Sequence, residues 1–283
     1  MNNHEKFTEE TEEHLESIHW LLVIIDICID VVFYSGAIFT LFLTICLLYN
    51  FSKPNNILNT AYYYVLVLGY TVDLCSVITY ILDASVFPEI SPMKEINNII
   101  QWYAKLFVGF WNTLLVLNRL TALIWWNKHS KIWEGKFFAG IVLILFLYPF
   151  ILNGYSFGNP CQLNLHDDKC TEYMAESQNF VAISNGVNGI LSLIVGLFTA
   201  FAARFSVLAS KSSQKYEKQL LIQSIISSFL FGSYCALTAA YSIMYPYQND
   251  KDFAVLFDFT RDFSNLFYKI FYYSSAVLLV ILS

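Results

Sequence analysis

The chain has 283 residues, of which 57 % are hydrophobic and 13 % charged, with a mean hydropathy of +0.51. A soluble domain usually carries about 25 % charged residues, so this composition leaves no room for a separate soluble domain. The formal net charge of −6 is less informative as a total than in its distribution between the loops.

Seven long apolar segments follow one another along the chain. Each is long enough for a helix that crosses the roughly 30 Å hydrocarbon core of a bilayer, which takes about 20 residues, and a helix satisfies its own backbone hydrogen bonds in lipid. The sequence therefore predicts an all-α fold, a seven-transmembrane helix bundle forming one domain over residues 20–283. This excludes soluble enzymes and nucleic-acid-binding proteins. The predicted spans are residues 20–49, 57–82, 99–126, 136–156, 178–208, 220–244 and 253–283.

The segment before the first span, residues 1–19, is acidic, whereas a cleavable signal peptide begins with basic residues. We interpret it as a translocated, solvated extracellular tail. It contains His4, His14 and His19, but nothing in the sequence fixes their geometry, so neither a metal site nor a cofactor is predicted.

The loop charges predict the orientation of the bundle. With the N-terminus outside, eight Lys and Arg residues fall on the cytoplasmic side and four on the outer side. Because short loops rich in Lys and Arg stay in the cytoplasm, the N-terminus is predicted to be extracellular and the C-terminus cytoplasmic. The cytoplasmic set is Lys53, Lys128, Lys131, Lys136, Arg204, Lys211, Lys215 and Lys218.

Two of the six cysteines, Cys161 and Cys170, share the predicted outer loop between the fourth and fifth spans. Nine positions apart in an oxidising compartment, they predict an intraloop disulfide. The alternatives are two free thiols or a bridge to another chain.

Charged side chains inside the predicted spans are the sharpest functional signal, because placing a charge in hydrocarbon costs about 2.5–3.5 kcal/mol on insertion scales. Five of them lie at a similar depth, about 10 Å below the outer surface at a rise of about 1.5 Å per residue. They either line a ligand pocket that opens to the outside or pair with one another as bridges between helices. Polar residues of the fifth and sixth spans either extend that pocket or make ordinary interhelical hydrogen bonds. The candidate ligand-binding residues are Asp26, Asp73, Lys105, Arg261 and Asp262, together with Asn185, Asn188, Tyr234, Thr238 and Tyr241.

Arg119 lies near the cytoplasmic end of the third predicted span, about two turns before the predicted basic loop 127–136. Its guanidinium either snorkels to the interface, or tethers neighbouring helices in one state and is released when the cytoplasmic face opens for a partner.

Three stretches resemble a known family. The pair Asn118-Arg119 stands where other seven-span receptors have an acidic-Arg-aromatic motif, and Trp126–Trp133 contains a His-x-x-Ile-Trp pattern. The run Lys215–Leu221 fits as well. With these motifs the chain resembles the nematode serpentine chemoreceptors, and most of all the Srg (serpentine receptor class gamma) superfamily of seven-transmembrane G-protein-coupled receptors.

The resemblance implies a receptor located in the plasma membrane, which for this family includes the ciliary membrane of sensory neurons. Such a receptor binds an external small molecule and signals to a heterotrimeric G protein. Arg119 becomes the switch arginine, next to Asn118. The lysines on the G-protein-facing loops are then Lys128, Lys131, Lys211, Lys215 and Lys218.

The chain departs from the receptor pattern at three places. Asn118 replaces the acid that normally restrains the arginine, the last span lacks an N-P-x-x-Y motif, and the top of the third span lacks a cysteine. A membrane transporter or ligand-gated channel is the alternative function, although no internal repeat typical of transporters is detectable. A receptor-like protein that only assists assembly or trafficking is a third. No H-E-x-x-H motif occurs, and no enzyme is predicted.

Overall fold

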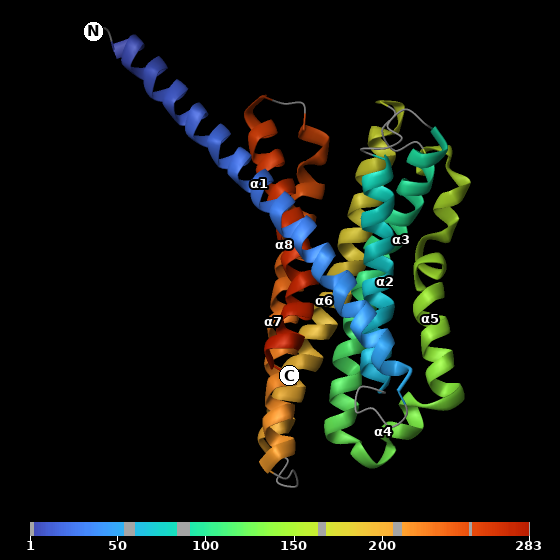
Figure 1. The fold of residues 1–283 in the computed structure, drawn as a ribbon. Coiled ribbons are helices and arrows are strands. Elements are labelled where there is room, and N and C mark those ends of the chain that lie inside the picture. Colours follow the sequence, from blue (N-terminus) through green and yellow to red (C-terminus); the bar gives the residue numbers. More distant parts are fainter. Residues whose placement is uncertain are drawn as a thin grey trace.

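In the computed structural model the chain forms an α-helical bundle (Figure 1). The structure describes residues 3–53, 60–83, 91–163, 168–205, 211–248 and 251–282, and it describes side chains at 20–53, 60–83, 92–125, 127–163, 169–199, 201–202, 222–223, 225–248 and 253–277. No strand occurs within these ranges. The helices are α1 (Asn3–Phe51), α2 (Ala61–Ile81), α3 (Ser91–Ile124), α4 (Trp126–Trp133), α5 (Gly135–Asn153), α6 (Thr171–Phe205), α7 (Lys211–Met244) and α8 (Lys251–Leu282).

Each of the seven predicted spans overlaps one helix, and together these form an all-α serpentine bundle. Among the described residues, six of the helices are long and apolar enough to cross a membrane by length and composition, namely α1, α2, α3, α5, α6 and α7. The described side chains of α8, at residues 253–277, include Asp258, Arg261, Asp262 and Lys269, and this stretch is not in that set. α8 nevertheless packs along α1 and α7 (Figure 1).

The structure differs from the sequence prediction at three element boundaries. The predicted tail 1–19 is helical from Asn3 onward and continues into the first span, projecting from the bundle (Figure 1). α3 begins at Ser91, eight residues before the predicted span, and Pro92 lies in its first turn, where the missing backbone N–H has no helical partner to lose. Most of α4 lies in the predicted basic loop 127–136, and its Trp133 is buried and donates a hydrogen bond to Thr121 of α3.

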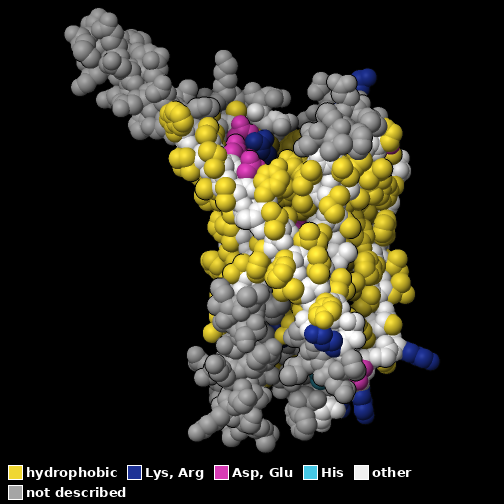
Figure 2. All heavy atoms as spheres, in the orientation of Figure 1, with side chains coloured by type: hydrophobic (Ala, Val, Ile, Leu, Met, Phe, Trp, Pro, Cys, Tyr) yellow, Lys and Arg dark blue, Asp and Glu magenta, His cyan; other side chains and the backbone are white. Residues whose placement is uncertain are grey.

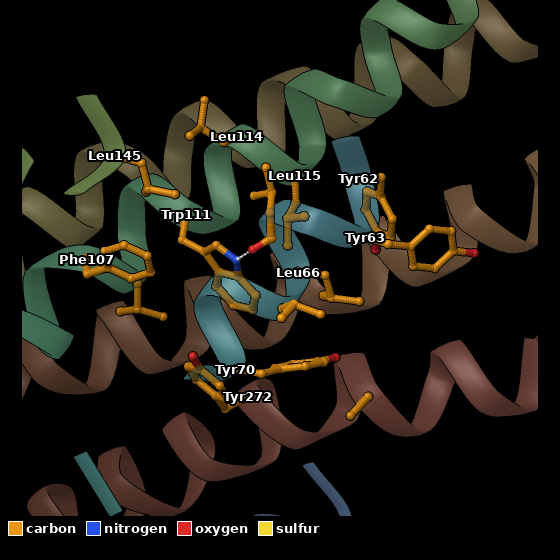
Figure 3. Close-up of a cluster of buried hydrophobic side chains, with 14 of the residues drawn as sticks. Tyr62, Tyr63, Leu66, Tyr70, Phe107, Trp111, Leu114, Leu115, Leu145 and Tyr272 are labelled. Carbon is orange, nitrogen blue, oxygen red and sulfur yellow. Dashed lines mark hydrogen bonds between the residues drawn. The ribbon is translucent and has the colours of Figure 1, made fainter. Parts of the chain in front are cut away.

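The core lies where α2, α3 and α8 meet, and Figure 3 shows its largest side chains. Trp111 of α3 is 1 % exposed, and its Nε1 donates a hydrogen bond of 2.7 Å to the Val65 carbonyl of α2. Its ring stacks on Tyr272 of α8, with ring centroids 5.3 Å apart. The Tyr272 hydroxyl donates to the Gly69 carbonyl of α2. One aromatic pair thus ties three helices together.

A second hydroxyl in this core gives a testable contribution to stability. The hydroxyls of Tyr70 and Ser275 share a hydrogen bond of 3.1 Å between α2 and α8. Tyr70→Phe keeps the ring and removes only this bond, and interhelical hydrogen bonds in membranes average about 0.6 kcal/mol. We expect a drop of roughly 1–2 °C in the melting temperature of the solubilised protein. Tyr247→Phe, at an exposed tyrosine, is the control and should change nothing; an equal drop in both variants would contradict the assignment.

The outer surface of the bundle is apolar around its middle, as Figure 2 shows. Large apolar side chains of α1, α5 and α6 point outward, with Ile38, Ile151 and Ile183 each about 70 % exposed. Soluble proteins rarely expose apolar surface on this scale, so the belt faces lipid and the chain is a multi-pass membrane protein.

Candidate functional site

The two ends of the bundle carry different polar features. We call one the disulfide end, because Cys161 and Cys170 form a disulfide there in the segment between α5 and α6. The opposite end, where α4 connects α3 to α5, is the α4 end. Each of these ends holds one candidate site.

A cavity of about 350 Å³ lies near the disulfide end, between α1, α2, α3, α6 and α8. It lies within the bundle, a usual location for ligand sites in helical proteins. Most of its lining side chains are polar or charged. They are Ile29, Asp30, Phe33, Ser76, Tyr80, Asn97, Asn98, Gln101, Trp102, Lys105, Gln162, Met174, Ser177, Gln178, Val181, Asn265 and Lys269.

Two lysines from different helices face this cavity. Lys105 comes from α3 and Lys269 from α8, and each is half-buried. The Lys269 Nζ lies 4.3 Å from the centroid of the Phe33 ring of α1. Lys269 also interacts electrostatically with Lys105 and with the buried Asp73. Within the described part of the chain, neither ammonium has a carboxylate within 4.0 Å.

Amide side chains fix the wall of the cavity. Gln101 accepts a hydrogen bond of 3.0 Å from the Ser76 hydroxyl and donates to the Asn97 side chain and the Ser76 carbonyl, which joins α2 to α3. Gln162 accepts a hydrogen bond of 2.6 Å from the Tyr173 hydroxyl, next to the disulfide. These bonds hold the wall in one geometry.

Of the ten predicted ligand-binding residues, Lys105 lines the cavity. The buried Asp73 lies near Lys269, and its Oδ2 has no hydrogen-bond partner in the described part of the chain. Asp26, Arg261 and Asp262 lie outside the cavity lining. Arg261 makes ion pairs of 3.0 Å with Asp258 and Asp262, all on α8, and interacts electrostatically with the exposed Asp26 of α1.

The polar residues predicted in the fifth and sixth spans mainly join helices. Asn185 of α6 donates a hydrogen bond of 2.9 Å to the Lys105 carbonyl, and Asn188 donates one of 2.8 Å to the Tyr148 hydroxyl of α5. The hydroxyls of Thr238 and Ser264 share a hydrogen bond of 2.8 Å between α7 and α8. The remaining two, Tyr234 and Tyr241, make ring contacts with Tyr268 and Phe257 of α8.

The cavity also contains residues that the ligand-binding prediction omitted, above all Lys269 and the amides of α3. The signal was present, because Asn97, Gln101 and Lys105 are spaced i, i+4 and i+8 and so share one helix face. It was missed because the prediction began the third span at residue 99 and placed Asn97 in a loop.

At the α4 end, Arg119 is 9 % exposed, and its guanidinium Cζ lies 3.6 Å from the centroid of the Tyr62 ring of α2. Its Nε and Nη2 have no hydrogen-bond partner in the described part of the chain, and neither does Nδ2 of Asn118. No carboxylate of the described residues pairs with Arg119. A cation–π contact therefore stands where an ion pair would otherwise hold a buried guanidinium.

Helix α4 is attached to α3 by Thr121. Its hydroxyl accepts a hydrogen bond of 2.7 Å from Trp133 Nε1 and lies 3.2 Å from His129 Nδ1. Burial lowers the pKa of His129 below its usual value, which favours the neutral ring. Lys128 and Lys131 are exposed on α4. The predicted coupling lysines Lys211, Lys215 and Lys218 belong to α7, but their side chains lie outside the described residues.

The model of a protein family described as Srg family chemoreceptor matches residues 38–283, from α1 to the end of the chain. No curated protein matches the chain. The match covers α2 to α8, the motifs around Arg119 and the cavity lining except for Ile29, Asp30 and Phe33 of α1. The chain therefore belongs to the Srg family of chemoreceptors.

Proposed function

We propose that this chain is a G-protein-coupled chemosensory receptor of the plasma membrane, extending to the ciliary membrane of sensory neurons. It binds an external small molecule in the cavity at the disulfide end, which faces outward with the N-terminus. It signals to a heterotrimeric G protein at the α4 end, which faces the cytoplasm. The observation that carries the proposal is that one central helix, α3, contributes Lys105 to the cavity and Arg119 to the opposite end.

The position of α3 supports a signal between the two sites. It contacts α2, α4, α5, α6 and α7, so a shift of α3 changes its packing against most of the bundle. Lys105 and Arg119 are 14 positions apart, which is about 21 Å along a helix. A ligand changes the populations of the receptor states only if it binds one of them more tightly. Contacts between the ligand and Lys105 are one way to do so.

The α4 end supports the proposal for the G protein. Arg119 has buried donors without partners there, which opening of the cytoplasmic face would make available, and helix α4 presents the exposed Lys128 and Lys131 at the same end. A partner with acidic groups or backbone carbonyls matches this surface.

A second-messenger assay in a heterologous cell tests the proposal against a panel of small volatile and water-soluble compounds, with patch clamp alongside. For any compound that activates, Ser177→Phe takes up space in the cavity and is expected to weaken the response by about fivefold or more, since overpacking typically costs 1–3 kcal/mol. Ile183→Phe, on the exposed face of the same helix, is the matched control and should respond normally.

An N-terminal epitope tag that antibodies reach in intact cells measures surface expression and checks the orientation. Membrane current that does not depend on G protein would overturn the receptor assignment in favour of a channel. An equal response in Ser177→Phe would overturn the cavity as the ligand site.

A further inference from the structure

We propose that the cavity takes a small organic acid whose carboxylate lies between the ammonium groups of Lys105 and Lys269. This rests on the proposed function only in that the cavity is the ligand site of the receptor. It goes further by naming the chemical class of the ligand and the two residues that select it.

The charges around the cavity are the first argument. Lys105 and Lys269 face the same space from α3 and α8 and interact electrostatically with each other. The exposed Asp30 is the lining acid, so the lining carries one more positive charge than negative. Asp73 also attracts Lys269 but makes no ion pair with it within 4.0 Å. Holding two ammonium groups together in a membrane protein is costly, and an anion between them removes that cost.

The hydrogen-bonding capacity of the wall is the second argument. Trp102 Nε1 and Gln162 Nε2 are buried N–H donors with no acceptor among the described residues. The side-chain acceptors next to them are used, since Gln162 Oε1 accepts from Tyr173 and Gln101 Oε1 accepts from Ser76. The lining residues Trp102 and Gln162 thus carry two N–H donors without acceptors, and a carboxylate is an acceptor-rich group that pairs with such donors.

The two lysines are also held in place before a ligand arrives. The Lys105 carbonyl accepts the hydrogen bond from Asn185, which fixes this turn of α3 against α6. The Lys269 ammonium rests over the Phe33 ring and lies 5.3 Å from the centroid of the Tyr268 ring. Contacts with aromatic rings orient an ammonium but are weaker than a desolvated ion pair. The Lys269 ammonium can therefore exchange its ring contacts for an ion pair with a carboxylate. Such preorganisation lowers the entropy cost of binding.

The size of the cavity limits the rest of the ligand. About 350 Å³ lies at the lower end of ligand pockets, roughly 300–1,000 Å³. Ile29, Phe33 and Val181 supply the apolar part of the lining. A short carbon chain or a single ring bearing the carboxylate fits these limits.

The test is a thermal-shift measurement on the full chain in nanodiscs of phosphatidylcholine. The probes are hexanoate, benzoate and 4-hydroxyphenylacetate, each compared with its uncharged primary amide. At least one acid is expected to raise the melting temperature in a saturable manner, while its amide does not. Equal shifts for acid and amide in every pair, or no acid-dependent shift in any pair, would overturn the proposal.

Variants of the two lysines locate the anion. Lys105→Gln and Lys269→Gln are each expected to weaken binding of the acid by about tenfold or more, since a hydrogen bond to a charged group contributes about 1.5–3 kcal/mol. Lys94→Gln removes an exposed lysine of the same helix α3 that lies outside the cavity lining, and it should bind normally. If one of the cavity variants fails to fold, the other variant and the acid–amide comparison in the unmodified chain still test whether the cavity binds a carboxylate. Normal binding by both cavity variants would refute the site.

Two further arms separate the alternatives. Nanodiscs that contain phosphatidylglycerol test whether a lipid headgroup takes the site; stabilisation by this lipid that needs both lysines, without any effect of the acids, would overturn the organic acid as ligand. The signalling assay separates the two proposals. Acids that bind while no compound of the panel activates the G protein would leave this inference standing and contradict the proposed function. Activation only by uncharged compounds, with a weaker response in Ser177→Phe, would support the proposed function and overturn this inference.

Discussion

Arg119→Ala is expected to abolish activation of the G protein while surface expression stays largely intact. The buried guanidinium has two nitrogen atoms without partners in the described part of the chain, so it can donate to a bound partner once the cytoplasmic face opens. Removing a buried arginine usually destabilises a fold by leaving a buried acid without its partner. No described carboxylate pairs with Arg119, so its removal leaves no such acid behind. The second-messenger assay and labelling of the N-terminal tag measure the two quantities. Unchanged signalling would contradict the switch role.

The contact between Arg119 and Tyr62 predicts a second effect at the same site. Asn118 stands where other seven-span receptors have an acid. The Tyr62 ring covers the guanidinium instead, with Arg119 Cζ 3.6 Å from the ring centroid. If the ring restrains Arg119 in the resting state, Tyr62→Leu raises basal signalling, because a desolvated cation–π contact contributes up to about 2 kcal/mol. Tyr62→Phe keeps an aromatic face and should keep the basal level low.

A matched control for this effect exists at the same end of the bundle. The Nζ of the exposed Lys53 lies 4.4 Å from the centroid of the Tyr49 ring. Exposed cation–π contacts contribute about 0.5–1 kcal/mol, and neither residue of this one belongs to α3. Lys53→Ala should therefore leave both basal and stimulated signalling unchanged. An unchanged basal level in Tyr62→Leu would show that the ring does not restrain the arginine.

The sequence predicted the long helices well because their signal is local. A run of about 20 apolar residues is readable without knowledge of any neighbour, and all seven runs overlap helices. The short helix α4 depends instead on a tertiary contact, the hydrogen bond from Trp133 to Thr121. No local pattern contains that bond, so the segment was interpreted as a loop.

The candidate ligand site was only partly predictable for a geometrical reason. Distance from the loop gives the depth of a residue in the membrane, and Lys105 and Arg261 were placed at the same depth. The rotation of each helix decides which charges face inward, and it follows from packing rather than from sequence position. Lys105 faces the cavity, whereas Arg261 pairs along its own helix with Asp258 and Asp262.

Gly69→Ala is expected to be among the most damaging single substitutions in the bundle. A Cβ at Gly69 would overlap the Trp111 ring at Cε2, Nε1 and Cζ2. Only a residue without a side chain lets α2 and α3 approach so closely here. The Trp111 ring cannot move aside, because its Nε1 is bonded to Val65 and its face stacks on Tyr272. Overpacking in a core typically costs 1–3 kcal/mol and occasionally more. We expect a large fall in surface expression and in the melting temperature.

The control for this prediction is another helical glycine. A Cβ added at Gly186 of α6 would meet no atom within 4 Å, so Gly186→Ala gains helix propensity, about 0.8–1.0 kcal/mol, without a collision. It should be neutral or stabilising, and a comparable loss in both variants would show that the glycine itself, not its contact, is needed.

A double-mutant cycle tests whether the collision with Trp111 is the cause. Trp111→Leu is destabilising by itself, because it removes a buried ring and its hydrogen bond to Val65. It also removes the ring atoms that the methyl group introduced by Gly69→Ala would meet. If the collision causes the loss, the double variant is therefore less destabilised than the sum of the two single variants, since residues in contact couple. Additive losses would place the damage elsewhere, for example in the bond that the Tyr272 hydroxyl donates to the Gly69 carbonyl.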